Sequence, residues 1–136
     1  MAAEMLAVGV GCTRGAPCEV LAAGIDAVLA QHGLERSSVR ALASIEHKHD
    51  EVGLLTLAAE RGWPLTFYAA EALAAAACVP SSARVMEAVG TPSVAEPAAL
   101  LRAASRTLLV PKTIHRDAES GHRVTVAIAR LTTGGA

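Results

Sequence analysis

Apolar residues in the first part of the chain follow two different periods. Met5 to Val10 is a short apolar run closed by glycines, which is typical of a strand buried on both faces in a parallel sheet. From Val20 to Leu29 the apolar residues recur at helical spacing, with Pro17 in the first turn and Gly33 after the end. The pattern predicts a strand followed by a helix.

The next segment repeats this plan. Val39 to Ile45 is predicted as a strand. Asp50 is placed to cap the helix that follows, and Gly62 marks its end together with Pro64. The apolar side of this helix is expected to carry Val52, Leu54, Leu55 and Ala58. Two successive strand–helix units indicate βαβ topology.

The remaining elements are less regular. Leu65 to Tyr68 is predicted as a third strand and Glu71 to Cys78 as an Ala-rich helix. Short helices are expected around Val85 and Val89 and around Leu100 and Leu101. Two further strands are expected at Thr107 to Val110 and Val124 to Ala129, joined by a mobile hairpin loop at Lys112 to Arg123.

These elements predict one α/β domain over residues 1–131, with residues 132–136 as a disordered tail. The fold class is three-layer α/β/α with a mixed, mainly parallel sheet. Hydrophobic residues make up 52% of the chain but aromatic residues only 2%. The core is therefore expected to consist of Ala, Val, Leu and Ile, which suits helices lying close on a sheet.

Charge and cysteine usage narrow the function classes. A formal net charge of −1 gives no uniform positive field, so we expect no nucleic-acid partner. Cys12, Cys18 and Cys78 form no CxxC pair and are odd in number, which favours reduced thiols. The start of the chain has no basic region, and no apolar run is long enough to cross a bilayer. We expect a cytoplasmic protein without membrane contact.

The first candidate site is the glycine loop Gly9 to Gly15, between the first predicted strand and helix. Its glycines allow a ligand to approach the backbone, and the helix N-terminus offers free N–H groups to anionic oxygens. The spacing is GxGxxxG, and Glu46 lies further away than in a dinucleotide fingerprint. An anion- or carboxylate-binding loop, a nicotinamide or flavin site and a purely structural turn all remain open.

The second candidate is Ser44 to Gly53, which runs from the end of a strand into a helix, where open α/β sheets bind ligands. Lys48 would pair with a carboxylate, and Glu51 would be an acid, a base or an orienting group. The alternative is a solvated, charged loop. His47 and His49 are acceptable metal ligands, but the lysine between them is unfavourable, so no metal is expected.

The third and fourth candidates lie in the second half. Ser93 and Glu96 have the spacing of a capping box. Pro97 disfavours a helical Glu96, so both residues could instead belong to a loop that faces a ligand. Lys112 follows a predicted strand, where a lysine is usually solvated. It becomes a candidate binding residue if it converges with Arg14 and Lys48 at one edge of the sheet.

In order and spacing these stretches resemble the CobE/CbiG C-terminal domain family of cobalamin biosynthesis. The matching motifs are GxGCxxG, SxxxKxxExG, GxxSVAExAAL, a lysine after a strand, and a final VTVAxA. In this chain they are Gly9 to Gly15, Ser44 to Gly53, Gly90 to Leu100, Lys112 and Val124 to Ala129. The resemblance covers nearly the whole chain.

The resemblance implies a cytoplasmic protein that binds a corrin or precorrin intermediate as a carrier or accessory factor, with other cobalamin-pathway enzymes as further partners and no cofactor. Fused family members open the lactone of cobalt-precorrin-5A, so a hydrolase is the alternative, with Glu51 or Glu96 as the general base. This chain looks like the stand-alone type. The ligand-binding residues carried over are Gly11, Cys12, Arg14, Gly15, Lys48, Glu51, Ser93, Glu96 and Lys112. We expect Cys12, Lys48, Ser93 and Lys112 to converge at one edge of the sheet.

Overall fold

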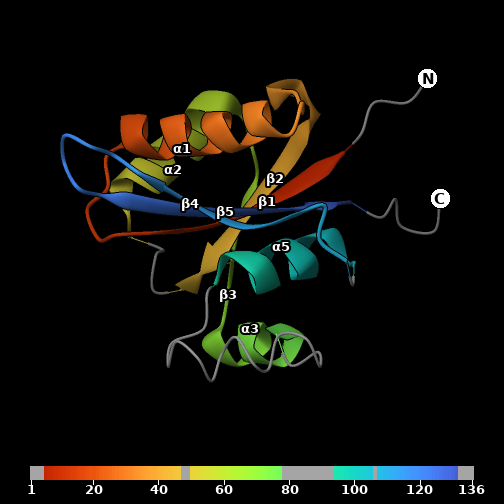
Figure 1. Ribbon diagram of the computed structural model, residues 1–136. Coiled ribbons are helices and arrows are strands. Elements are labelled where there is room, and N and C mark those ends of the chain that lie inside the picture. The colour runs from red at the N-terminus through yellow and green to blue at the C-terminus, as the bar shows by residue number, and fades with distance from the viewer. Residues whose placement is uncertain (1–4, 47–49, 78–93, 106, 132–136) are drawn as a thin grey trace.

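The computed structural model of the protein describes residues 5–46, 50–77, 94–105 and 107–131. Its elements, shown in Figure 1, are β1 (Leu6–Cys12), α1 (Cys18–Gln31), the short 3-10 helix η1 (Arg36–Ser38), β2 (Val39–Ile45), α2 (Val52–Arg61), β3 (Leu65–Tyr68), α3 (Ala70–Ala77), α5 (Ala95–Ala103), β4 (Val110–Arg116) and β5 (Arg123–Arg130). The bounds of β2 and β3 are those predicted from the apolar runs.

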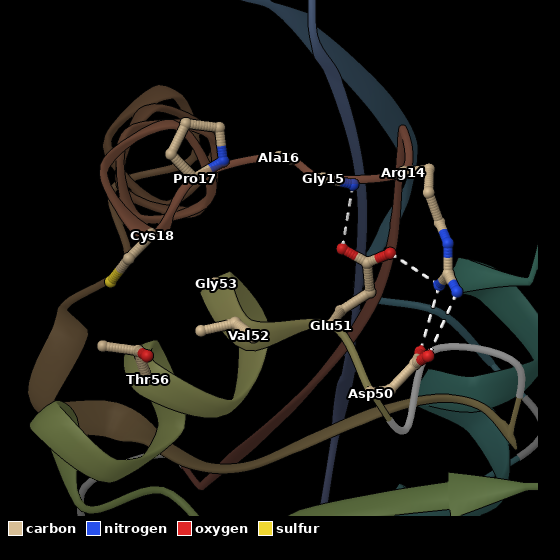
Figure 2. A pocket seen from close by; sticks show the side chains of 10 residues that line it. All are labelled: Arg14, Gly15, Ala16, Pro17, Cys18, Asp50, Glu51, Val52, Gly53 and Thr56. Atoms are coloured by element: carbon tan, nitrogen blue, oxygen red, sulfur yellow. Dashed lines mark hydrogen bonds and ion pairs between the residues drawn. The ribbon is translucent and has the colours of Figure 1, made fainter.

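The five strands form one mixed sheet in the order β3-β2-β1-β5-β4. β1, β2 and β3 are parallel neighbours, whereas β5 is antiparallel to both β1 and β4. Four of the strands therefore point in one direction, and β5 runs the other way. The carboxyl ends of β1 and β2 lie at the same edge, where the loop after β1 lies beside the start of α2 (Figure 2).

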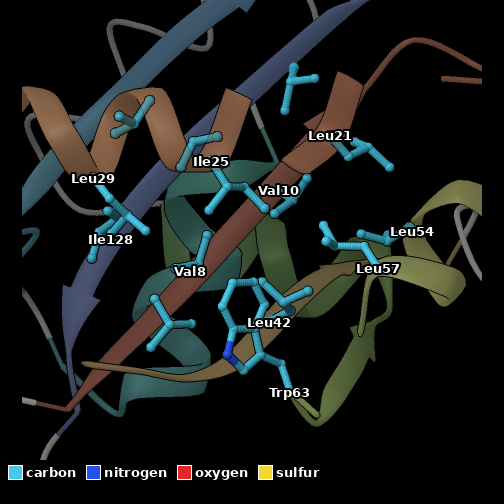
Figure 3. Packing of buried hydrophobic residues seen from close by; sticks show 14 of the residues in the cluster. Val8, Val10, Leu21, Ile25, Leu29, Leu42, Leu54, Leu57, Trp63 and Ile128 are labelled. Atoms are coloured by element: carbon cyan, nitrogen blue, oxygen red, sulfur yellow. The ribbon is translucent and has the colours of Figure 1, made fainter. Parts of the chain in front are cut away.

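The two faces of the sheet differ in side-chain size, and helices cover both, which gives the three-layer α/β/α fold. Large side chains of β1, β2 and β5 pack with α1 and α2 on one face (Figure 3). They include Val8, Val10, Leu42, Val126 and Ile128, against Leu21, Ile25 and Leu57. The other face carries mainly small residues, Ala7, Ala43, Ala127 and Ala129, beneath α5 and α3.

The close approach of α5 to β1 at Gly9 explains why the second face is made of small residues. A Cβ atom at this position would collide with the backbone carbonyl oxygen of Ala95, in the first turn of α5. Helix and strand thus approach backbone to backbone, with no room for a side chain between them. This contact places the N-terminus of α5 near the carboxyl end of β1.

The structure corrects the predicted course of the last two strands. The strand expected at Thr107 to Val110 begins only at Val110 and continues to Arg116, so Lys112 lies inside it. The expected mobile loop Lys112 to Arg123 is reduced to a short turn, closed by a hydrogen bond from the Asp117 N–H to the His122 carbonyl oxygen at 2.8 Å. The sequence did not predict most of β4 because only its first residue, Val110, is buried, so this edge strand has no continuous apolar run.

Helix α2 also differs from expectation. Its N-cap residue is Glu51, with no capping bond from a side chain, so the predicted cap by Asp50 is wrong. Leu54, Leu57 and Ala58 form its buried side. Val52 and Leu55, predicted to face the core, are 73% and 41% exposed.

No helix in the described parts of the chain has the length and apolar character needed to cross a membrane.

Candidate functional site

The glycine loop and the start of α2 are joined by a network of charged groups (Figure 2). The Arg14 guanidinium donates from Nη1 to Glu51 Oε2 at 2.7 Å, and both of its terminal nitrogens donate to the Asp50 carboxylate at 3.1 Å. The Gly15 N–H donates to Glu51 Oε1 at 3.0 Å. Loop and helix, which are 36 residues apart in sequence, are thereby held together at the carboxyl edge of the sheet.

Glu51 is the central residue of this network. Its side chain is only 4% exposed, and each of its carboxylate oxygens accepts one of the hydrogen bonds from the loop. Gly15 has a φ of 80°, in the left-handed region that favours glycine, and this conformation presents its N–H to the carboxylate. A buried carboxylate that receives two donors is well suited to positioning the loop.

A pocket of about 450 Å³ opens beside this network. Its lining residues are Arg14, Gly15, Ala16, Pro17, Cys18, Asp50, Glu51, Val52, Gly53 and Thr56. Helices α1 and α2 both begin in it, and neither N-terminus has a side-chain cap. First-turn amides of a helix lack partners within the helix and attract anionic oxygens. Together with the exposed Val52, the pocket can bind an anionic group attached to an apolar body.

The charged side chains that line the pocket are negative on balance. One guanidinium, that of Arg14, lies against two carboxylates, and the hydrogen bonds that it donates to Asp50 and Glu51 raise the pKa of Arg14. Cys18 lies on the other side of the pocket, where burial and then the charge of Glu60 raise the pKa of its thiol. Among the described residues, neither Cys12 nor Cys18 forms a disulfide. Attraction of an anion to this pocket therefore depends on the helix amides as much as on Arg14.

The other predicted site residues lie apart from this network. Gly11 faces α5, where an added Cβ would lie 3.2 Å from Val94 Cγ2. Cys12, at the end of β1, packs partly against the core on the α1 side. Lys48 and Ser93 lie outside the described residues, so their predicted convergence with Cys12 stays a prediction.

Glu96 and Lys112 contact each other on the α5 side. Glu96 Oε2 accepts the backbone N–H of Lys112 at 2.9 Å, next to the register shift between Val110 and Thr113. The Glu96 carboxylate thus satisfies an N–H group at an irregular point of the edge strand. Val124 on β5 pairs with Cys12 on one side and with His115 on the other, so His115 marks the carboxyl end of β1 on strand β4. Lys112 lies three residues before His115. That is about 10 Å along the strand, so Lys112 is not at the edge where it was expected.

Two features of the site were not predicted from sequence. Asp50 was expected to cap α2, and its pairing with Arg14 was not predicted, although the two adjacent carboxylates Asp50 and Glu51 are a signal for an ion-pair network. Thr13 is the second: its N–H donates to the Arg123 carbonyl oxygen at 3.0 Å, and its Oγ1 accepts the Arg123 N–H at 2.6 Å. In the described parts of the chain no group of three or more His, Cys, Asp or Glu side chains could hold a metal ion.

Comparison with known proteins gives consistent matches. The model of the family "Cobalamin synthesis G C-terminus" matches residues 6–129. The chain is 35% identical to a cobalt-precorrin-5A hydrolase of Priestia megaterium over 94% of its own length, but it spans only 33% of that protein. It is 32% identical to Protein CobE of a Sinorhizobium species, over 80% of this chain and 72% of that one.

A solved structure agrees with both matches. The crystal structure of CobE, a protein from the cobalamin (vitamin B12) biosynthetic pathway, superposes with a TM-score of 0.75 at 36% identity and covers 96% of each chain. The family model spans most of the chain, and the relatives share both sequence and fold with it. The chain therefore belongs to the cobalamin synthesis G C-terminus family of cobalamin biosynthesis proteins.

Proposed function

We propose that this protein binds a corrin-ring intermediate of cobalamin biosynthesis as a carrier or accessory factor. The observation that carries the proposal is the pocket of about 450 Å³ in which two uncapped helices begin, beside the Arg14 guanidinium. A corrin precursor has carboxylate side chains around an apolar ring. The helix amides and Arg14 suit a carboxylate, and the exposed Val52 suits the ring edge.

A hydrolase acting on a precorrin-5A type lactone is the second candidate, because the chain is 35% identical to a cobalt-precorrin-5A hydrolase. The geometry favours the carrier. A general base needs a carboxylate oxygen available to the attacking water. Glu51 is 4% exposed and accepts bonds from Arg14 and Gly15, and Glu96 accepts the Lys112 N–H. Both candidate bases are engaged in holding the fold.

Titration with a corrin polycarboxylate, cobyrinic acid, tests the proposal. We expect the corrin to co-elute with the protein in gel filtration, because the amides and Arg14 hold its carboxylates. Val52→Asp should weaken binding about tenfold, since it adds a negative charge at the pocket mouth. Folding should be retained, because Val52 is 73% exposed.

Ser37→Asp is the matched control. It adds the same charge beside the start of β2, at the opposite edge of the sheet, and should leave binding unchanged. A parent protein that elutes without the corrin would overturn the proposal. To separate the two candidates, a precorrin-5A type lactone should be incubated with the protein: release of an opened product would favour the hydrolase, and an unaltered lactone the carrier.

A further inference from the structure

Strands β4 and β5 form a hairpin (Figure 1). Two arginines lie opposite each other near its turn. Arg116 is paired directly with Arg123 across the ladder, and both residues are exposed. Neither forms an ion pair with a described residue. Like charges directly opposite on antiparallel strands destabilise a hairpin. Folding alone therefore does not explain this arrangement, which we call the hairpin arginine pair.

The pair lies on the face of the sheet that α5 covers. Side chains alternate along a strand, so Arg123 shares a face with Thr125, which neighbours Gly11 on β1. A Cβ at Gly11 would contact both Thr125 and Val94, the residue before α5. Ile114 is paired with Thr125 and is 60% exposed. An exposed apolar side chain thus lies beside the two guanidinium groups.

One member of the pair, Arg123, is hydrogen-bonded to the glycine loop. Arg123 exchanges two backbone-directed bonds with Thr13, at 2.6 Å and 3.0 Å, and Thr13 directly precedes Arg14. The pocket beside Arg14 opens toward α1 and α2, whereas the hairpin arginine pair lies on the α5 face. Two sets of groups suited to anions therefore flank one end of β1 from opposite faces of the sheet.

We propose that the hairpin arginine pair is a second carboxylate-binding subsite for the corrin polycarboxylate. The inference rests on the proposed function and extends it. At the pocket, Arg14 already pairs with Asp50 and Glu51, so it offers a ligand only part of its charge, and a ligand with many carboxylates needs further positive charge at this edge. Arginine forks match carboxylates in bidentate geometry. The ligand's charge also relieves the repulsion between Arg116 and Arg123, and Ile114 contacts its apolar body.

Arg116→Gln and Arg123→Gln test the subsite, with cobyrinic acid as the probe. Each variant should raise the Kd about three- to tenfold, because one charge-assisted contact is lost. The Tm should stay the same or rise, because a like-charge pair is removed. Arg40→Gln is the matched control: Arg40 is exposed on β2 beside Val39, which pairs with Leu6 at the opposite edge. It should leave the Kd unchanged.

Salt gives an independent readout. Raising the ionic strength should weaken binding by the parent more than by either variant, because each variant has one fewer screened contact. A parent that binds no cobyrinic acid would overturn this inference together with the proposed function. A parent that binds it, with both variants indistinguishable from Arg40→Gln, would overturn the subsite alone. Variants that lose stability as well as affinity would show that the pair is structural, which also overturns the subsite.

Discussion

Replacing Glu51 by Gln should destabilise the whole domain. Glu51 joins the glycine loop to α2 through Gly15 at 3.0 Å and Arg14 at 2.7 Å. A glutamine keeps the shape, but its amide group must face one of these two donors with its own N–H. The bond from the Gly15 N–H to Glu51 is part-buried, and losing it costs about 1.5 to 3 kcal/mol as a hydrogen bond to a charged group. The ion pair between Glu51 and Arg14 is screened by solvent on its exposed Arg14 side, so we add nothing for it to this free-energy cost.

That loss corresponds to a Tm lower by about 5–10 °C for a domain of this size. Thermal unfolding followed by circular dichroism measures it. The adjacent Asp50→Asn is the matched control, because Asp50 pairs with the same arginine but its side chain is 55% exposed. We expect its Tm to stay near that of the parent. If Glu51→Gln and Asp50→Asn unfolded at the same temperature as the parent, the positioning role of Glu51 would be refuted.

Two further predictions concern the core and the surface. Gly9→Ala should cost about 3 kcal/mol or prevent folding, because the added methyl meets the Ala95 carbonyl. Gly11→Ala on the same strand meets side-chain atoms alone, Val94 Cγ2 at 3.2 Å and Thr125 Cβ at 3.9 Å, and should cost far less in urea unfolding; equal losses would contradict the close approach of α5. Hydrogen bonds from Arg61 lower the pKa of Asp26, so this carboxylate stabilises the fold above its ordinary pKa, and the contribution is lost as the pH falls through the lowered value. Asp26→Asn should therefore be less stable than the parent at pH 7, and the difference should disappear as the pH falls through the lowered pKa; a difference that persisted after Asp26 is protonated would contradict the ion pair.

The sequence predicted the elements in which the spacing of the apolar residues matches the side chains that are buried. β2 and β3 were found to the residue because each is a short run of apolar or β-branched residues between turn signals. Helix α2 shows where periodicity alone fails. Two apolar stripes at helical spacing were available, one through Val52 and Leu55 and another through Leu54 and Leu57. Only packing against the sheet and α1 decides that the second stripe is buried.

The site was only partly predictable for the same reason. The motifs identified Arg14, Gly15 and Glu51, which the structure brings together. They gave no indication that Glu51 is bonded to Gly15, since contacts across 36 residues depend on the close approach of loop and helix. The hairpin arginine pair was missed because Arg116 lay in a predicted loop. Without the ladder, nothing in the sequence sets it opposite Arg123.

The placement of β5 affects how the chain can fold during synthesis. β1 is synthesised well before β5, the neighbouring strand that ends at Arg130. Until that strand is made, one edge of β1 has no native partner, while its apolar side chains are already exposed. Pairings between such distant segments form slowly, and unpaired apolar edges favour aggregation in the interval. The nascent protein is therefore expected to depend on chaperones until the hairpin is complete.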